Sequence, residues 1–477
     1  MKKSWVPAPG TRGPTFEGRS DGTPVIDNPN ELVNHGEREL REHCLRILQS
    51  AWSAAEPKGA ALQALQSLRN ELRFCDQRFT TDSAHRVFFL GCGKASGGVA
   101  MAVEELLGPD LFAGLVVVPR GDVYPLRKVT VLESDHPLPT RASLLAGRRL
   151  LKLAHQARQG DLVICSITGG SSSLACVPPP GISMGQMRVL YRRLLESGAD
   201  ISEINTVRRH ISRIKGGRLA QAIHPAEIWN ITVSDVVDDT LEFISDPTVI
   251  NYSNSNQALE VLGRYSLRDR IPHRVLDHFM GLGNEALPSL SGVAITNQVV
   301  ISGQHVVDAM KREAQTLGYA AISLGTALRG ESRGVAGALS AMARELSRCS
   351  HRAQRGWAVI GGGGEVTVRI DRRREWQCGG PNQELALAYG TYIPTDCRSV
   401  LAAVDSDGHD GGTAYAGGLV GSDTRQEAQA QGIDLISALR THSSSSALES
   451  LGAAIRTGPT GTNVNDFLTV LVGHSSG

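Results

Sequence analysis

The sequence lacks an excess of either charge, because 49 Lys and Arg residues oppose 48 Asp and Glu residues and the formal net charge is +1. Without a net positive field the protein is not steered onto a polyanion, and nucleic acid is excluded as a principal partner. The chain also lacks a long apolar run: stretches such as 115–118 are far shorter than the ~20 residues of a membrane helix. No export signal follows Lys2 and Lys3. We therefore expect a soluble, cytoplasmic protein that does not bind a membrane.

Paired cysteines and common nucleotide-binding fingerprints are absent as well. The eight cysteines are scattered, without a CxxC pair and without histidines at zinc-finger spacing, so we expect reduced thiols and no zinc site. No GxxxxGK[ST] segment occurs, and the glycine-rich loop 91–96 is not a full GxGxxG because Ser96 fills its last position. A P-loop NTPase and a typical dinucleotide-binding oxidoreductase are therefore disfavoured.

Lysine is scarce, with eight Lys among the 49 basic residues. A lysine inside or beside a glycine-rich segment is then less easily explained by chance. Lys94 in the segment GCGKA and Lys215 in the segment IKGG are the two that meet this description. Both are candidates for contacting an anion.

What is present is a long chain of 477 residues in which short apolar runs alternate with helical stretches. The length fits two or three packed units. Several runs end in Gly, Ser or Asp and lead into a helix, which indicates βα units around a mainly parallel sheet; the runs are 87–90, 115–118, 129–132, 162–165 and 228–233. A second alternation begins near residue 292.

These patterns predict an α/β protein with two α/β domains, each with a mainly parallel, Rossmann-like sheet, and an active-site cleft between them. The predicted division is an irregular lead-in over residues 1–36, an N-terminal domain over 37–290 and a C-terminal domain over 291–477. In open α/β sheets, ligands bind at the carboxyl ends of the strands. The residues just past each apolar run are therefore the candidates for the site.

Two of these strand ends carry glycine-rich loops. Gly91–Gly98 leads into a helix, and its glycines would let backbone N–H groups approach an anion beside Lys94. Thr168–Ser173 offers two glycines and several hydroxyls after the run 162–165. A tight βα turn with a solvated lysine explains the first loop equally well, and a surface loop is the alternative for the second.

A third candidate is a helix predicted over Asp200–Leu219, with Asp200 and Glu203 as its capping box and Gly216 and Gly217 at its end. An apolar stripe faces the core, and beside it runs a polar stripe at helical spacing, composed of Asn205, Arg208, Ser212 and Lys215. Such a stripe can line a cleft and bind an anion. An ordinary solvated helix face is the alternative.

Carboxylates follow two further strands. Asp235, Asp238 and Asp239 come after the run 228–233, and Asp407 comes after the run 400–404. Mg²⁺ bound to nucleotide phosphates uses one or two protein carboxylates, so these positions fit a metal. Helix capping and turn formation are the alternatives. From the residues alone, the combination indicates phosphoryl transfer or the binding of a phosphorylated ligand.

The order of the motifs resembles the class II glycerate 2-kinases, the glycerate kinases with a C-terminal MOFRL domain. The resemblance spans roughly residues 37–475 and rests on these ordered segments: GCGKA (91–95), HPLP (136–139), TGGSS (168–172), NTVRRHISRIKGGRL (205–219), SDVVDD (234–239), GGEVT (363–367), GGPNQEL (379–385), SDGHDG (406–411) and GPTGTNVND (458–466). It implies a kinase that uses ATP and Mg²⁺ and phosphorylates the 2-hydroxyl of D-glycerate, a small-molecule substrate. A homodimer is the assembly to be tested.

The resemblance also implies roles for individual residues. Lys94, Arg208 and Lys215 would be catalytic, and Asp235, Asp239 and Asp407 would hold the metal. Substrate or phosphate would be bound by a larger set of residues, comprising Gly93, Ser96, His136, Thr168, Gly169, Gly170, Ser171, Ser172, Asn205, Glu365, Asn382 and Glu384.

The chain departs from the family pattern at several positions. Pro381 stands where the family has an arginine, Asp238 and Asp246 stand where it has glycines, and Thr140 replaces an aspartate. One lost arginine and two added carboxylates would make the cleft less favourable for a small carboxylate. We expect an ATP-dependent kinase for glycerate or a related hydroxylated metabolite, and the changed positions favour an acceptor other than, or besides, D-glycerate, neutral and cationic ones included. The alternatives are a glycerate 2-kinase in which Arg208 or Arg209 compensates, a non-catalytic ligand-binding relative and, remotely, a hydroxypyruvate reductase.

Overall fold

The computed structural model describes residues 25–235, 241, 246–283, 285–349, 354–370 and 377–474. The chain divides into two compact units. The N-terminal unit consists of Ala55–Gly303 together with Gly461–Asn465, and the C-terminal unit contains the rest, including the helix that precedes Ala55. Each unit is described by itself. None of the helices within the described ranges is both long enough and apolar enough to cross a membrane.

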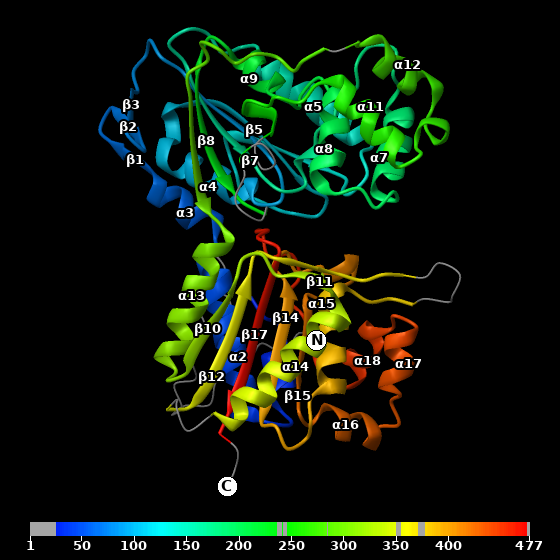
Figure 1. Cartoon of the computed structure of the whole chain (residues 1–477). Coiled ribbons are helices and arrows are strands. Elements are labelled where there is room, and N and C mark those ends of the chain that lie inside the picture. Colours follow the sequence, from blue (N-terminus) through cyan, green and yellow to red (C-terminus); the bar gives the residue numbers. More distant parts are fainter. Residues whose placement is uncertain are drawn as a thin grey trace, which may run out of the picture. The chain divides into compact units, whose positions relative to one another are not determined.

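The N-terminal unit is built on a six-stranded sheet in which every neighbouring pair is parallel. Its strand order is β6-β5-β4-β7-β8-β9 (Figure 1). The strands are β4 (Val87–Cys92), β5 (Leu111–Pro119), β6 (Val129–Ser134), β7 (Leu162–Ile167), β8 (Glu227–Val233) and β9 (Ile295–Ile301). The central strands are apolar on both faces, which is why they read as continuous hydrophobic runs in the sequence.

Helices cover both faces of this sheet. One face packs against α3 (Pro57–Ala64) and α4 (Ser96–Leu107), and a small antiparallel sheet of β1 (Leu65–Leu68), β2 (Glu71–Phe74) and β3 (Gln77–Thr80) adds to the same core. The other face packs against α5 (Arg141–Ala154) and α9 (Arg218–Ile223). A separate helical core contains α7 (Met184–Leu195), α8 (Ile201–His210), α11 (Ser255–Arg264) and α12 (His273–Gly281).

The strand order creates a topological switch point between β4 and β7. From β4 the chain adds β5 and β6 on one side, and it then returns to add β7, β8 and β9 on the other side. Ligands in doubly wound sheets bind where the order reverses, at the carboxyl ends of the strands. The two glycine-rich loops predicted to bind an anion follow these two strands directly.

The C-terminal unit contains a mixed six-stranded sheet of order β10-β12-β17-β14-β15-β16. The strands are β10 (Ala320–Gly325), β12 (Gly356–Gly362), β17 (Asp466–Gly473), β14 (Ser399–Asp405), β15 (Gly417–Gly421) and β16 (Ala454–Ile455). Only β10 and β12 pair in parallel, because β17, from the end of the chain, enters antiparallel between β12 and β14. The α/β class is confirmed, and the mainly parallel arrangement holds for the N-terminal sheet.

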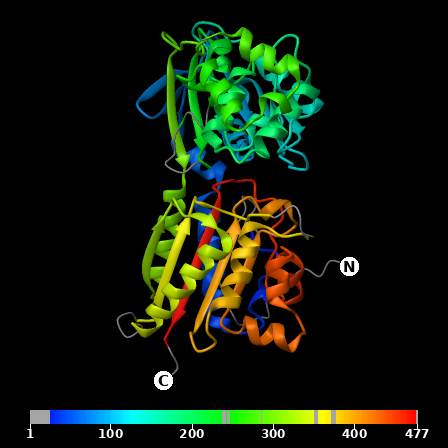
Figure 2. The same cartoon turned by 45° about the vertical axis from the view of Figure 1, so that its right-hand side comes forward.

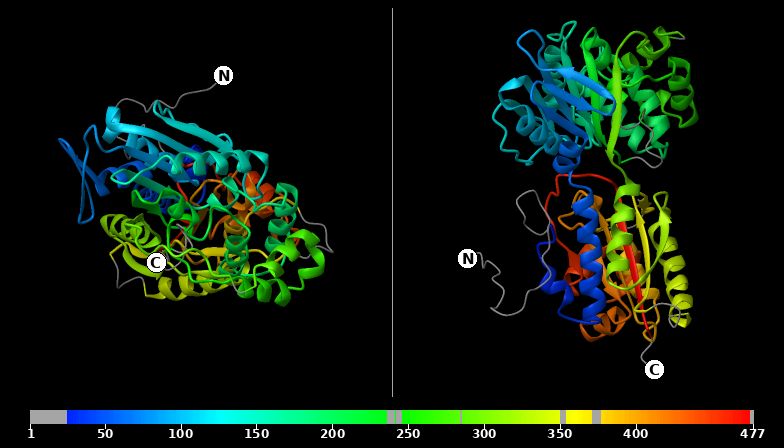
Figure 3. Two further views of the ribbon diagram at one scale, coloured as in Figure 1. Left: turned by 90° about the horizontal axis from the view of Figure 1, so that it is seen from above. Right: turned by 90° about the vertical axis from the view of Figure 1, so that its left-hand side faces the viewer.

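Helices also cover both faces of the C-terminal sheet. One face carries α14 (Ser332–Arg348), α15 (Pro381–Tyr392), α16 (Thr424–Ala430), α17 (Leu435–Arg440) and α18 (Ser444–Ser450) (Figures 1 and 2). The other face carries α2 (Arg38–Ala54) and α13 (Gly303–Thr316), which lie next to each other in Figure 3. β11 (Arg329–Glu331) and β13 (Glu365–Thr367) form a separate parallel pair.

The unit boundaries differ from the division predicted from the sequence. Residues 38–54, placed with the N-terminal domain by their position in the chain, form α2 of the C-terminal unit. Trp52 explains this placement, because its ring packs edge-on against Phe467 and its Nε1 donates to the carbonyl oxygen of Ser406 at 3.0 Å. At the other boundary, β9 pairs with β8 and so belongs to the N-terminal unit, which extends to Gly303 instead of 290.

Candidate anion-binding site

Backbone and hydroxyl hydrogen bonds join the loops after β4 and β7. The amide of Lys94 donates to the carbonyl oxygen of Gly169 at 2.9 Å, and the amide of Ala95 donates to Oγ1 of Thr168 at 3.2 Å. Ser96, buried at the start of α4, donates from Oγ to the carbonyl oxygen of Ser166 at 2.8 Å. These bonds hold together the two glycine-rich loops that were predicted to bind an anion, hereafter the anion loops. Ser96 and Thr168 provide the side-chain contacts between them.

Gly93 is required for this close approach. Its φ is +140°, and a Cβ added there would lie 2.1 Å from Oγ1 of Thr168 and 2.7 Å from the carbonyl oxygen of the same residue. Real Cβ atoms do not approach backbone so closely, so a larger residue would separate the loops. The glycine therefore fixes the position of the next residue, Lys94.

Lys94, His136 and Gly170 lie close together at the carboxyl ends of β4, β6 and β7. A Cβ added to Gly170 would lie 3.3 Å from Cδ2 of His136 and 3.5 Å from Cγ of Lys94. Lys94 is half-buried and precedes the 12-residue helix α4, whereas His136 is exposed. The structure thus brings together three of the residues predicted to contact substrate or phosphate.

Asp235, at the end of β8, lies against the same loop. A Cβ added to Gly169 would lie 1.9 Å from Oδ2 of Asp235, so the carboxylate occupies the space that the glycine leaves. Asn463 donates from Nδ2 to Oδ2 of Asp235 at 3.1 Å, and Asn465 donates to its carbonyl oxygen at 2.7 Å. Asp235 therefore lies next to the anion loops. Asp238 and Asp239 lie outside the described residues.

The helix predicted over Asp200–Leu219 is shorter than expected. Its capping box between Asp200 and Glu203 is confirmed, but α8 ends at His210 and a turn leads into α9 at Arg218. Gly216 and Gly217 have φ of +65° and +77°, so they form part of this turn and do not terminate α8. Asn205 and Arg208 therefore lie on the helix, while Ser212 and Lys215 lie in the connection.

The turn places Lys215 in a fully buried ionic network. Its Nζ lies 2.7 Å from Oγ of Ser172, in the loop after β7, and 3.0 Å from Oδ2 of Asp246. The other oxygen of Asp246 accepts a hydrogen bond from Nε of Arg209, and the amide of Gly216 donates to Oδ2 at 3.1 Å. Lys215, Arg209 and Asp246 are each at most 3% exposed. Lys215 therefore connects the loop after β7 to a buried ion pair.

From the sequence, Asp246 was interpreted as a carboxylate added to a segment that faces the ligand. The structure corrects this interpretation. Burial favours the neutral acid, but Lys215 and Arg209 outweigh it and hold the pKa of Asp246 below its ordinary value. The carboxylate is thus ionised and matched by two cations. It neutralises part of a cationic cluster and does not repel a ligand from an open surface.

Arg208 and Asn205 present buried polar atoms that lack protein partners. Arg208 is 6% exposed and its guanidinium stacks on the ring of Tyr191 at 4.5 Å, while its Nε has no hydrogen-bond partner among the described residues. Oδ1 of Asn205, one turn earlier on α8, likewise has no partner in the described part of the chain. Burial lowers the pKa of Arg208, yet a guanidinium keeps its charge in proteins.

Several charges act on Lys215. Burial lowers its pKa, and the neighbouring cations Arg209 and Arg208 lower it further, whereas Asp246 raises it. A buried cation is costly unless an anion pairs with it, and Asp246 provides such a partner for Lys215 and Arg209. The cluster therefore places paired positive charge directly beside the loop after β7.

The C-terminal unit contains a second group of buried polar residues around Asn382. Its Nδ2 donates to Oδ1 of Asp466 at 2.6 Å, while the amides of Asn382 and Gln383 donate to Asp410 at 3.1 and 2.8 Å. Asp410 thereby caps α15, whose first residue is Pro381. Burial raises the pKa of Asp410 to about 6 and that of Asp466 to about 8. Asp410 and Asp466 lie inside motifs noted in the sequence, but no role had been predicted for them.

The other predicted residues of this unit have different surroundings. Glu384 is buried, with Nε of Arg333 at 2.7 Å and Nδ1 of His442 at 2.8 Å from its two carboxylate oxygens, which indicates a structural role. Glu365 is exposed at the start of β13. Asp407 is half-buried and accepts the amide of His409 at 2.9 Å, so it acts at least as a turn former.

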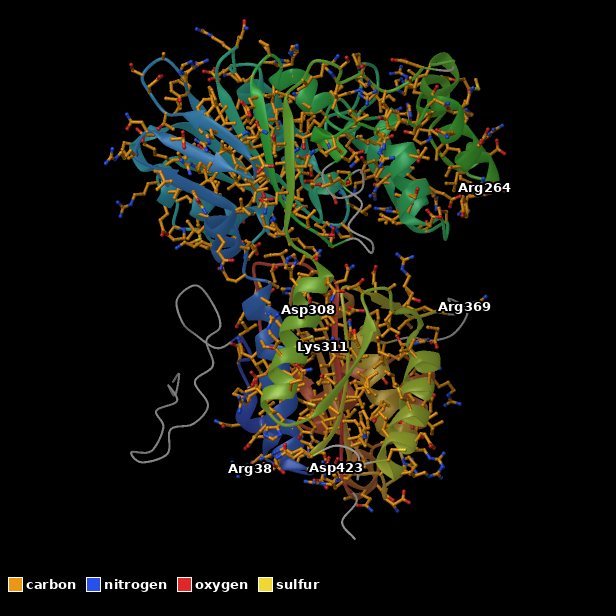
Figure 4. All side chains as sticks on the ribbon, turned by 60° about the vertical axis from the view of Figure 1, so that its left-hand side comes forward. Arg38, Arg264, Asp308, Lys311, Arg369 and Asp423 are labelled. Atoms are coloured by element: carbon orange, nitrogen blue, oxygen red, sulfur yellow. The ribbon has the colours of Figure 1, made fainter. Side chains whose placement is uncertain are left out.

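Within the described ranges, His35, Asp423 and Glu427 are the one group of three side chains that could together hold a metal. This group does not contain the predicted Asp235 or Asp407. Asp423 follows β15 and Asp407 follows the antiparallel neighbour β14, so the two lie at opposite ends of the C-terminal sheet. Asp423 is labelled in Figure 4, far from Asp308 in α13. Arg41 lies 3.1 Å from Asp423 and already neutralises it, so this group is better explained as a salt-bridge cluster.

Comparison with known families gives two matches along the chain. A domain of unknown function, DUF4147, matches residues 43–280, and the MOFRL family matches residues 358–466. The first range contains Lys94, the loop 168–172 and the cluster around Lys215, and the second contains Asn382 and Asp407.

Comparison with individual proteins extends over nearly the whole chain. A glycerate 2-kinase of Pyrococcus horikoshii is 35% identical over 91% of this chain and 98% of its own length. A D-glycerate 2-kinase of Thermotoga maritima is 34% identical with the same two coverages. A crystal structure of a glycerate kinase from Thermotoga maritima matches with a TM-score of 0.77 at 31% identity, covering 91% of this chain and 99% of that one.

Proposed function

Because the chain belongs to the glycerate 2-kinase family, we propose that it transfers the γ-phosphoryl group of ATP to a hydroxyl of glycerate or of a closely related hydroxy acid. The chain is a kinase, and what we propose is the identity of its phosphoryl donor and of its phosphoryl acceptor. Relatives in archaea and bacteria share this name and align along almost all of the chain.

The observation that carries the proposal is the joining of two glycine-rich loops beside Lys94, at the switch point of a parallel sheet. Such loops suit phosphate and carboxylate groups, which ATP and a small hydroxy acid carry. Two hydrogen-bonding atoms that lack partners among the described residues, Nε of Arg208 and Oδ1 of Asn205, add a donor for a carboxylate and an acceptor for a hydroxyl. An acceptor that carries both groups fits this pair.

Lys94 would act on the phosphoryl group during transfer. Phosphoryl transfer depends mainly on positioning and on neutralising charge at the equatorial and leaving oxygens. Lys94 is held by its backbone bond to Gly169, and the stem of its side chain passes Gly170, which also lies close to His136. A mobile point charge on a fixed backbone suits this task.

Asp235 is the described residue that best fits Mg²⁺. This ion prefers oxygen ligands and is usually bound by one or two carboxylates together with substrate phosphates. Asp235 provides a half-buried carboxylate against Gly169, and the amide of Asn463 orients it. A magnesium ion held by Asp235 would supply positive charge that neutralises the phosphate groups during transfer.

The experiment is an ADP-release assay with ATP and Mg²⁺, using D-glycerate and a panel of neutral polyols, amino alcohols and other hydroxy acids as acceptors. We expect turnover with D-glycerate or another hydroxy acid, and none with acceptors that lack the carboxylate. Lys94→Ala serves as the control, with the fold checked by circular dichroism. Turnover with neutral polyols only, or an unchanged rate in Lys94→Ala, would overturn the proposal.

A further inference from the structure

A groove of ≈ 690 Å³ lies on the surface of the N-terminal unit, on the side of α5 that faces the segment before α7. One wall is a stripe of α5 at helical spacing, which includes Leu144, Arg148, Leu151 and Lys152. The other wall is the loop that contains Pro178, Pro179 and Pro180. The volume falls within the range of small-molecule sites in proteins.

The charged side chains that line the groove are all basic or histidine. Arg148, Lys152 and Arg213 are exposed, His155 lies with them, and no acidic residue is among the lining residues. Within the described chain none of these four side chains makes a hydrogen bond or an ion pair. Their charges are therefore available to a ligand.

The surrounding sequence strengthens this pattern. Residues 136–195 contain seven Arg and one Lys but a single acidic residue, Asp161, in a chain whose overall net charge is +1. Asp161 is already paired, since both of its carboxylate oxygens accept hydrogen bonds from Arg86. Surface cations are usually interspersed with anions in soluble proteins. A segment so poor in acids indicates a surface selected for a negatively charged ligand.

The groove also offers apolar surface between its cations. Leu144, Leu151, Val177, Ile182 and the prolines line it, and proline walls are rigid because the ring fixes φ. Inorganic phosphate would use the cations but not this surface. The combination is suited to an organic anion that has a charged end and an apolar or aromatic body.

We propose that this groove is a second binding site, separate from the anion loops, for a small organic anion that carries a phosphate or carboxylate on an apolar body. The near-zero net charge of the whole chain does not favour a large polyanion. The groove's volume is that of a small-molecule site, which favours a small molecule over an extended peptide. The inference does not depend on the proposed function, because it uses none of the residues of the anion loops.

The test measures binding of 1-naphthyl phosphate to the full-length protein by fluorescence titration, with 1-naphthol and inorganic phosphate as probes of the apolar and charged parts alone. We expect 1-naphthyl phosphate to bind at least about tenfold more tightly than either part. The double variant Arg148→Glu/Lys152→Glu should weaken binding by about tenfold or more. It reverses two exposed charges, and the modest contributions of the two add up. Both side chains are exposed, so the fold should persist.

Arg149→Glu is the matched control, since Arg149 is an exposed neighbour on α5 that does not line the groove. It should change the affinity less than about twofold. Neither charge reversal touches the anion loops, so a loss confined to Arg148→Glu/Lys152→Glu separates the groove from those loops. Equal affinities for 1-naphthyl phosphate and 1-naphthol, equal effects of the two charge reversals, or binding of a glutamate-rich peptide but not of the probe would each overturn the proposal.

Discussion

Nζ of Lys215 lies 3.0 Å from Oδ2 of Asp246, and both side chains are almost completely buried. The two residues are 31 positions apart in the chain, and the same lysine contacts Ser172 in the loop after β7. This ion pair therefore fixes the loop that we expect to bind phosphate. Asp246 also pairs with Arg209, so one carboxylate serves two buried cations.

Asp246→Asn should destabilise the N-terminal unit. The change removes the carboxylate that pairs with Lys215 and Arg209, and breaking a buried ion pair on one side costs about 3–5 kcal/mol. Urea unfolding followed by circular dichroism measures this change. Asp277→Asn, at an exposed position in the same unit, is the control and should stay within about 0.5 kcal/mol of the wild type.

Inorganic phosphate should restore part of the stability of Asp246→Asn. A ligand that binds only the folded state stabilises it, and the variant has one more unmatched cation than the wild type. We expect a larger gain in unfolding free energy from phosphate in the variant than in the wild type. Equal gains in the two proteins would show that the cluster does not take up an anion.

Lys94→Ala should lower kcat by about 10²–10³-fold without unfolding the protein, because a preorganised cation that stabilises transition-state charge contributes on this scale. Steady-state kinetics measures the effect. Lys311→Ala is the matched control, because it also removes one lysine, from α13 of the C-terminal unit. Its kcat should stay within about twofold of the wild-type value. Similar losses in both variants would remove Lys94 from its proposed role.

Gly93→Ala should lower stability by about 2–4 kcal/mol and also reduce activity, because its Cβ would collide with the backbone of Thr168. Gly121→Ala separates collision from backbone strain, since Gly121 has a φ of +94° but no atom within 4 Å of an added Cβ. The two variants are compared by thermal unfolding. If Gly93→Ala lowers the thermal stability no more than Gly121→Ala does, the two loops can move apart without cost.

Asp410 and Asp466 should make the protein less stable as the pH rises from about 4 to 8. Burial raises the pKa of Asp410 to about 6 and that of Asp466 to about 8, so the folded state retains protons that the unfolded chain releases. For each carboxyl, the free energy of unfolding falls by about 1.4 kcal/mol per pH unit as long as the folded state keeps the proton and the unfolded state has lost it. Stability is therefore greatest at the acidic end of this window.

The comparison variant is Asp466→Asn, which cannot ionise. Between pH 6 and 8 its unfolding free energy should fall less steeply than that of the wild type, because only the wild type still carries a proton on Asp466 that the unfolded chain has released. Urea unfolding over this pH range gives both slopes. Parallel curves for the two proteins would show that Asp466 is already ionised at pH 6.

The sequence predicted the parts of the site that follow strand ends. The buried runs of β4, β7 and β8 are continuous in the sequence, so Lys94, Thr168 and Asp235 could be placed at one edge of a parallel sheet. The capping box of Asp200 and Glu203 is local and was also predicted correctly. Local signals therefore sufficed to locate the anion loops.

Contacts between distant parts of the chain could not be read from the sequence. The environment of Asp246 depends on Arg209 and Lys215, more than 30 residues earlier, and Asn463 reaches Asp235 across 228 positions. Likewise, the assignment of α2 to the C-terminal unit depends on the packing of Trp52 against Phe467. Helical periodicity continued past His210, so the turn before α9 was not predicted.

The most direct test of the central claim is ³¹P NMR of the purified protein with ATP, Mg²⁺ and D-glycerate, with Lys94→Ala measured in parallel. We expect ATP to be consumed and ADP to appear together with a new phosphomonoester of glycerate, and we expect the variant to form the ester at least about 100-fold more slowly. ADP without a phosphomonoester, or the same ester formed equally fast by Lys94→Ala, would contradict it.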